Sequence, residues 1–223
     1  RESHFVLTDV PLTFCVALTL LLALRAAEHP ALLAFVAAGA AAGLAAGVKY
    51  NGLMALSMPL VAAFMSGRRR SAQMMWTMAA ATACVLAFFV TTPYAIVALP
   101  EFLNGFGTQA AAFAPRQPSA EPSWLVYLKH LRLTLGWPGS LLALAGLVLA
   151  AVRSVRGPGH VRWVLLLVFP AVYFYLITGW TFLFARYALP MVPFIALWIA
   201  IATISGVSLL RRFDIPRALR TAV

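Results

Sequence analysis

Acidic residues are scarce in this 223-residue chain, which has six Asp and Glu against seventeen Lys and Arg. Charged residues make up 10% of the sequence, whereas a soluble domain usually carries about 25%. Six carboxylates cannot give a soluble coat to a chain that is 63% hydrophobic. This composition excludes intrinsic disorder, collagen and coiled coils, and it predicts a membrane protein.

Cysteine is equally sparse, which excludes a disulfide-rich secreted domain. Cys15 and Cys84 both lie in apolar runs, outside any CxxC or Cys/His cluster, and we interpret them as packing residues. A signal-peptide pattern is also lacking, because the chain starts at Arg1 directly before an apolar run. We expect that the natural protein has further sequence before Arg1.

Long apolar runs dominate the chain and are too long for the strands of a β-barrel. The fold class that we predict is all-α: a polytopic integral membrane protein forming a single transmembrane domain over residues 1–223. About seven spans are expected, at residues 10–24, 31–48, 52–65, 74–91, 139–152, 163–180 and 187–210.

The distribution of cations predicts the orientation of these spans. Eleven of the seventeen fall on one side, in the 68–70 turn, near the basic C-terminus and at other turns of the same side. By the positive-inside rule that side is cytoplasmic. The N-terminal segment, Lys49, Arg186 and a large loop at residues 93–138 then face outside. Cations interleaved with aromatics on a soluble face are absent, so no nucleic-acid partner is expected.

Small residues and two amphipathic stretches add local expectations. Gly39, Gly43 and Gly47 recur every four residues, which predicts close approach of another helix. Within the large loop, residues 99–113 and 124–135 are expected to form interfacial helices.

An acid at the start of the first span is the leading candidate for catalysis. One interpretation of Asp9 is a helix cap that accepts hydrogen bonds from free backbone N–H groups. The alternative is a functional acid that orients an acceptor hydroxyl or holds a divalent metal. His4 lies close enough in sequence to assist, although no regular metal-ligand spacing is present.

Cations and tyrosines on the same outer side are candidates for substrate binding. Lys49, followed by Tyr50, either snorkels toward headgroups or grips a lipid phosphate. Tyr94 alone would be read as an aromatic anchor of the interface. Arg186, followed by Tyr187, either flanks its span or holds phosphate oxygens through two parallel hydrogen bonds.

Four stretches together resemble the GT-C polytopic membrane glycosyltransferases. The resemblance is to the bacterial branch related to dolichyl-phosphate-mannose protein mannosyltransferases and lipid A aminoarabinose transferases. The stretches are SHFVLTDVPLTFCVALTLLLALR (residues 3–25), AAGLAAGVKYNGL (41–53), TTPYAI (91–96) and RYALPMVPFIAL (186–197). No single motif is specific, and the order, spacing and shared outer side carry the resemblance.

The resemblance implies an inverting enzyme that takes a sugar from a polyprenyl-phosphate donor to a protein or lipid acceptor. It implies transfer at the outer face of a bacterial inner membrane. Asp9 matches the family's second acid, while the principal acid belongs to an upstream outer loop that this sequence lacks. Lys49, Arg186 and Tyr187 match the donor-phosphate region, and Arg116 aligns loosely with a loop arginine. Some members hold a divalent metal, for which His4 and Asp9 are the candidate ligands.

Two other classes remain open on the sequence. A transporter or flippase for a phosphate-bearing or lipid-linked solute would use the same outer cations, and a structural membrane subunit would use none of them. Transport paths usually place ionisable residues within spans, and these spans have none near their centres. That absence favours chemistry at the membrane interface.

Overall fold

Helices account for nearly all of the part of the chain that the structure describes. The structure is a computed structural model, and it describes residues 8–113, 121–156, 159–180 and 183–212. No strand occurs among these residues, which confirms the predicted all-α class. The elements are α1 (Asp9–Glu28), α2 (Leu32–Val48), the 3-10 helix η2 (Tyr50–Leu56), α3 (Ser57–Phe64), α4 (Arg70–Thr91), α5 (Tyr94–Val97), α6 (Leu99–Phe113), α7 (Ser123–Arg156), α8 (His160–Thr178), the 3-10 helix η3 (Ala185–Met191) and α9 (Val192–Arg212).

Within the described residues, five helical segments are long and apolar enough to cross a membrane. They are Asp9–Glu28, Arg70–Thr91, Ser123–Val155, His160–Thr178 and Ala185–Leu210, and two shorter apolar helices cover Leu32–Val48 and Tyr50–Phe64. Large apolar side chains such as Phe14 and Val90 are exposed on these helices. Exposed apolar surface of this extent suits contact with lipid and not with water. The chain is therefore an all-α polytopic membrane protein. Five of the seven predicted spans coincide with the candidate spans, and the two predicted at residues 31–48 and 52–65 coincide with the shorter helices.

The core lies where α1, α2, α3 and α8 meet. Leu12, Val16 and Leu20 of α1 recur every four residues, and all three are buried. α2 packs mainly against α4 and α1. A Cβ added to Gly39 or Gly43 would collide with the α4 backbone at Ala80 or Cys84, so the small residues permit the close approach that their spacing predicted.

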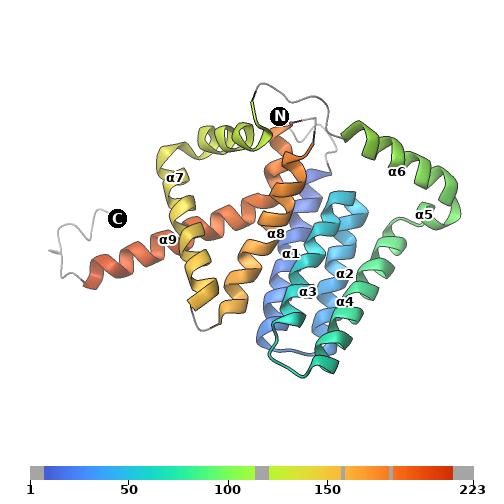
Figure 1. The fold of residues 1–223 in the computed structure, drawn as a ribbon, viewed down its shortest axis with the longest axis horizontal. Helices are drawn as coiled ribbons and strands as arrows, with labels where there is room; N and C mark the ends of the chain where they lie inside the picture. The colour runs from blue at the N-terminus through green and yellow to red at the C-terminus, as the bar shows by residue number, and fades with distance from the viewer. Residues whose placement is uncertain (1–7, 114–120, 157–158, 181–182, 213–223) are drawn as a thin grey trace.

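The helices run back and forth between two ends of the bundle, as Figure 1 shows. One end carries the N-terminus of α1, η2, α5, α6, the first part of α7 and η3, and we call it the Asp9 end. The opposite end carries the turns between α1 and α2 and between α3 and α4. There Glu28 and Arg162 form an ion pair that joins α1 to α8. The predicted grouping of Asp9, Lys49 and Arg186 follows from this alternation.

The predicted large loop at residues 93–138 is mostly helical. It contains α5 and α6, and α6 has the bounds expected from the sequence. The expected helix at residues 124–135 is the first limb of α7, which bends at Gly136. Gly136 has a φ of 65° and is followed two residues later by Pro138, so the backbone bends there without the steric cost of a side chain. The second limb then forms the span expected at residues 139–152.

Candidate functional site

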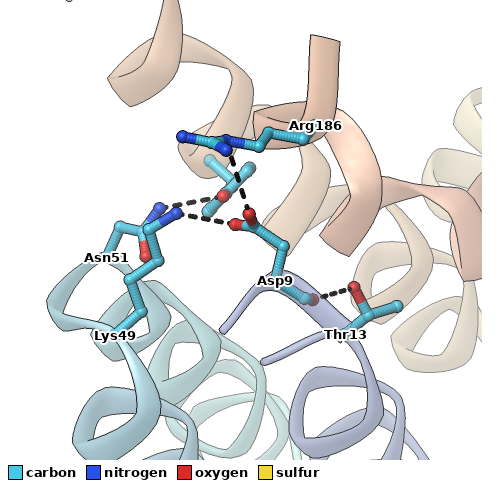
Figure 2. Close-up of polar contacts among 6 residues, drawn as sticks. Asp9, Thr13, Lys49, Asn51 and Arg186 are labelled. Carbon is cyan, nitrogen blue, oxygen red and sulfur yellow. Dashed lines mark hydrogen bonds and ion pairs between the residues drawn. The ribbon is translucent and has the colours of Figure 1, made fainter. Parts of the chain in front are cut away.

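Asp9 lies in the first turn of α1 with its carboxylate buried against two cations. Its Oδ1 is 2.6 Å from Lys49 Nζ and its Oδ2 is 3.8 Å from Arg186 Nε (Figure 2). The side chain is 3% exposed. The helix begins after Thr8, so Asp9 is its first residue, and the carboxylate pairs with the two cations.

Lys49 reaches Asp9 because the chain leaves α2 in an extended conformation. Its φ and ψ are −159° and 133°, and η2 starts at the next residue. The backbone N–H of Gly52 donates to the Lys49 carbonyl, and a Cβ at Gly52 would collide with the Ala45 backbone. This compact turn directs the Lys49 side chain inward, where it is 25% exposed. The ammonium therefore faces the bundle.

Arg186 and Tyr187 come from η3, which begins where the chain returns after α8. The Arg186 guanidinium lies 4.9 Å from the centroid of the Phe184 ring, and its side chain is 43% exposed. The buried Tyr187 ring lies beneath Lys49 Nζ, 4.4 Å from its centroid. Tyr187 also contacts Trp180 and Phe184 edge to face. The aromatic packing thus fixes the position of both cations relative to Asp9.

These charges leave the cluster with a surplus of positive charge. Among the residues that the structure describes, one carboxylate, from Asp9, faces two cations, Lys49 and Arg186, which leaves one positive charge unbalanced when all three are ionised. A partly buried site with such a surplus favours an anion, and a guanidinium and an ammonium are the usual phosphate ligands. The carboxylate can in turn accept a proton or a hydrogen bond from a hydroxyl group.

Two further polar residues adjoin the cluster and were not singled out from the sequence. Asn51 Nδ2 donates to the Tyr173 hydroxyl at 2.9 Å, and both side chains are buried. Asn51 Oδ1 has no hydrogen-bond partner within the described ranges. Asn51 lies in the KYNG sequence beside Lys49, which is a signal that could have found it. Tyr173 lies in an apolar run of α8 that gives no such signal.

Tyr50 and Tyr94 do not take part in these contacts. The Tyr50 ring packs edge to face on Phe102 and Phe106 of α6. Tyr94 is exposed at the start of α5. The structure therefore joins Asp9, Lys49, Arg186 and Tyr187, while Tyr50 and Tyr94 remain predictions. His4 and Arg116 lie outside the described residues.

The described residues do not fit a divalent-metal site. No group of three His, Cys, Asp or Glu side chains gathers anywhere in the ranges that the structure describes. Both Asp9 oxygens face cations, which would repel a metal ion at the same carboxylate. The metal stays a prediction that depends on His4, and no chemical step below uses it.

Comparison with known proteins gives one match. Residues 3–94 match a family model described as dolichyl-phosphate-mannose-protein mannosyltransferase. The search of curated proteins and the search of solved structures returned no significant match. The matched part spans α1 to α4 and includes Asp9 and Lys49, whereas Arg186 lies beyond it. The match confirms the predicted resemblance: over these residues the chain is similar to mannosyltransferase-like glycosyltransferases of the GT-C type.

Proposed function

We propose that this chain acts as a membrane glycosyltransferase that moves a sugar from a polyprenyl-phosphate donor to an acceptor. The observation that carries the proposal is the Asp9 carboxylate held between Lys49 and Arg186, inside and beside the segment that matches the mannosyltransferase family. The charge distribution favours the outer, periplasmic face of a bacterial inner membrane. The acceptor is a protein or a lipid.

In this proposal Lys49 and Arg186 bind the donor phosphate. Phosphate oxygens compete with the Asp9 carboxylate for both cations, and the surplus positive charge favours this exchange. The side chains are partly exposed, so each can turn toward a ligand without unfolding the turn that carries it. The two cations then stabilise the charge that develops on the phosphate as the sugar leaves.

Asp9 acts on the acceptor once the phosphate has drawn the cations away from it. The acceptor oxygen forms a bond to the anomeric carbon while the bond from that carbon to the phosphate oxygen breaks, which inverts the configuration. Asp9 orients the acceptor hydroxyl and helps to receive its proton. We assign Asp9 this supporting role because the family resemblance gives the principal acid to another loop.

A transfer assay on matched acid variants of α1 tests the proposal. Asp9→Asn keeps the shape of the side chain but removes its charge, and we expect sugar transfer to fall by about 10²-fold. Glu28→Gln removes the other acid of α1, which pairs with Arg162 at the opposite end, and should transfer at the wild-type rate. Equal rates for folded Asp9→Asn and wild type would contradict the proposal.

A further inference from the structure

An apolar groove lies in the elbow of α7, away from the Asp9 cluster. It has a volume of about 550 Å³ and is bounded by both limbs of α7, by α8, and by η3 and α9. Figure 1 shows the two limbs meeting at a sharp bend. The volume is within the range of ~300–1,000 Å³ that is usual for small-molecule sites. The elbow therefore has room for a ligand.

The chemistry of the lining selects the kind of ligand. The walls are formed almost wholly by apolar side chains, among them Leu131, Leu144, Pro170 and Phe174. A water molecule in such a groove would find few hydrogen-bond partners. Because the second limb of α7 and α8 are candidate membrane spans, we expect the groove to lie alongside lipid. A hydrocarbon chain is the occupant that suits these walls.

Among the described residues that line this groove, Arg132 is the only charged one. Its guanidinium lies 5.2 Å from the ring centroid of Trp137, and no acidic side chain within the described ranges pairs with it. Lys129 lies one turn earlier in α7 and, unlike Arg132, forms an ion pair with Glu121. Arg132 is on the limb of α7 at the Asp9 end, next to a tryptophan of the kind that marks membrane interfaces. The groove thus combines an apolar trough with a cation at its interfacial end.

α8 places this groove and the Asp9 cluster on different faces. Leu167, Pro170 and Phe174 recur at helical spacing and line the groove. Tyr173 points to another face, where it accepts the hydrogen bond from Asn51. Asp9, Lys49 and Arg186 are not among the groove residues. A lipid phosphate held at Arg132 is therefore separate from one held at Lys49 and Arg186.

We propose that the elbow of α7 is a binding site for one anionic phospholipid of the bilayer. Its phosphate pairs with Arg132 and one acyl chain lies between α7 and α8. Two observations favour a bilayer phospholipid over the lipid-linked donor: the groove has its own cation, and it opens on a face of α8 that the Asp9 cluster does not share. The site goes beyond the proposed function and does not depend on it.

Native mass spectrometry after reconstitution tests the site without an activity assay. The protein is placed in phosphatidylcholine vesicles containing a minor fraction of phosphatidylglycerol, then released in mild detergent. Wild type should retain one phosphatidylglycerol in preference to phosphatidylcholine. Arg132→Met should lower this retention on the order of tenfold, about 1.4 kcal/mol. Lys129→Met, which removes a neighbouring paired cation, should retain the lipid as wild type does.

A second pair of variants keeps the test decisive if Arg132→Met does not fold. Ala171→Phe fills the groove from α8 and should abolish retention, whereas Val172→Phe, at an adjacent exposed position outside the groove, should not. Equal retention of the two phospholipids by wild type would overturn the proposal. So would displacement of phosphatidylglycerol by polyprenyl phosphate at equal concentration, which would assign the groove to the donor.

Discussion

At the scale of single residues, the two partners of the Asp9–Lys49 ion pair are not equivalent. The Asp9 side chain is 3% exposed, whereas that of Lys49 is 25% exposed. Removing Lys49 therefore leaves a buried carboxylate with only the more distant Arg186, while removing Asp9 leaves a cation that can reach water. The loss of one partner costs most when the remaining charge is buried.

This asymmetry predicts an order of thermal stabilities in detergent. Lys49→Met should lose less than about 3–5 kcal/mol, the cost of breaking a fully buried pair, because Lys49 is partly exposed and Arg186 still faces the carboxylate. Asp9→Asn should lose even less, because the amide still fits the site. The double variant Asp9→Asn/Lys49→Met should be more stable than Lys49→Met alone. If Lys49→Met melts at the same temperature as Asp9→Asn, a buried carboxylate without its lysine partner is no more destabilising than the loss of the carboxylate itself, and the prediction is wrong.

Arg186 is the better of the two cations for testing the donor-binding proposal. Its side chain is 43% exposed, so replacing it should disturb the fold less than replacing Lys49, which is 25% exposed. Arg186→Met should weaken donor binding on the order of 10- to 100-fold, the value of a hydrogen bond to a charged group. Acceptor affinity should stay near that of wild type. Lys129→Met is the matched control, because it removes an exposed cation of the Asp9 end outside the cluster. Titration with a labelled donor gives the donor dissociation constant of each variant. Equal donor dissociation constants for Arg186→Met and Lys129→Met would exclude Arg186 as a phosphate ligand.

The sequence predicted the charged residues of the site better than its uncharged ones. Asp9, Lys49 and Arg186 could be grouped because each is a charge at a span boundary, and alternating spans bring such boundaries to one end. Tyr173 and Tyr175 have the same surroundings in sequence, yet Tyr173 is 0% and Tyr175 83% exposed. The two tyrosines differ only in which side of α8 faces the rest of the protein. Because α8 is apolar on all sides, its sequence does not show which side that is.

At the scale of elements, the close contact of α2 with α4 depends on glycine, which has no side chain to hold the two helices apart. A Cβ at Gly43 would collide with the Cys84 carbonyl and would lie 2.8 Å from Ala87 Cβ. Gly105, in α6, has nothing within 4 Å of such a Cβ. Both glycines lie within helices, so the substitution of each by alanine changes helix propensity in the same direction.

Gly43→Ala is expected to destabilise the protein by about 1–3 kcal/mol, because the two helices must separate. Gly105→Ala should be neutral or stabilising, since alanine is the better helix former by about 1 kcal/mol. Melting temperatures of the two variants in the same detergent provide the comparison. A Gly43→Ala variant as stable as Gly105→Ala would show that α2 and α4 tolerate a wider separation.

The helices themselves were largely predictable from the sequence, whereas the 3-10 helix η2, which joins α2 to α3, was not. The bounds of α6 are those of the predicted interfacial stretch at residues 99–113, and the bend of α7 falls between its predicted surface limb and its predicted span. The 3-10 conformation of η2 was not expected, because residues 52–65 read as one apolar run. The tight turn at Lys49 sets the start of η2, and its geometry depends on the packing of Gly52 against α2.

At the scale of the whole molecule, the orientation in the membrane is still a prediction from the cations. Thr108 of α6 and Ser71 in the first turn of α4 are both exposed. In Figure 1, α6 and the start of α4 lie toward opposite ends of the bundle. Cys15 and Cys84 are buried, so single introduced cysteines can be compared against a weakly reactive background. In intact cells a membrane-impermeant maleimide should label Thr108→Cys and should reach Ser71→Cys only after permeabilisation. The reverse pattern would place the Asp9 end in the cytoplasm.

The most direct test of the central claim is an experimental structure of the protein with a polyprenyl-phosphate sugar bound. The account predicts that the donor phosphate lies within about 3 Å of Lys49 Nζ and of the Arg186 guanidinium, the usual distance of a hydrogen bond. It also predicts that the Asp9 carboxylate has separated from Lys49 and faces the sugar. A donor phosphate bound elsewhere, with the Asp9–Lys49 pair still closed, would contradict the account.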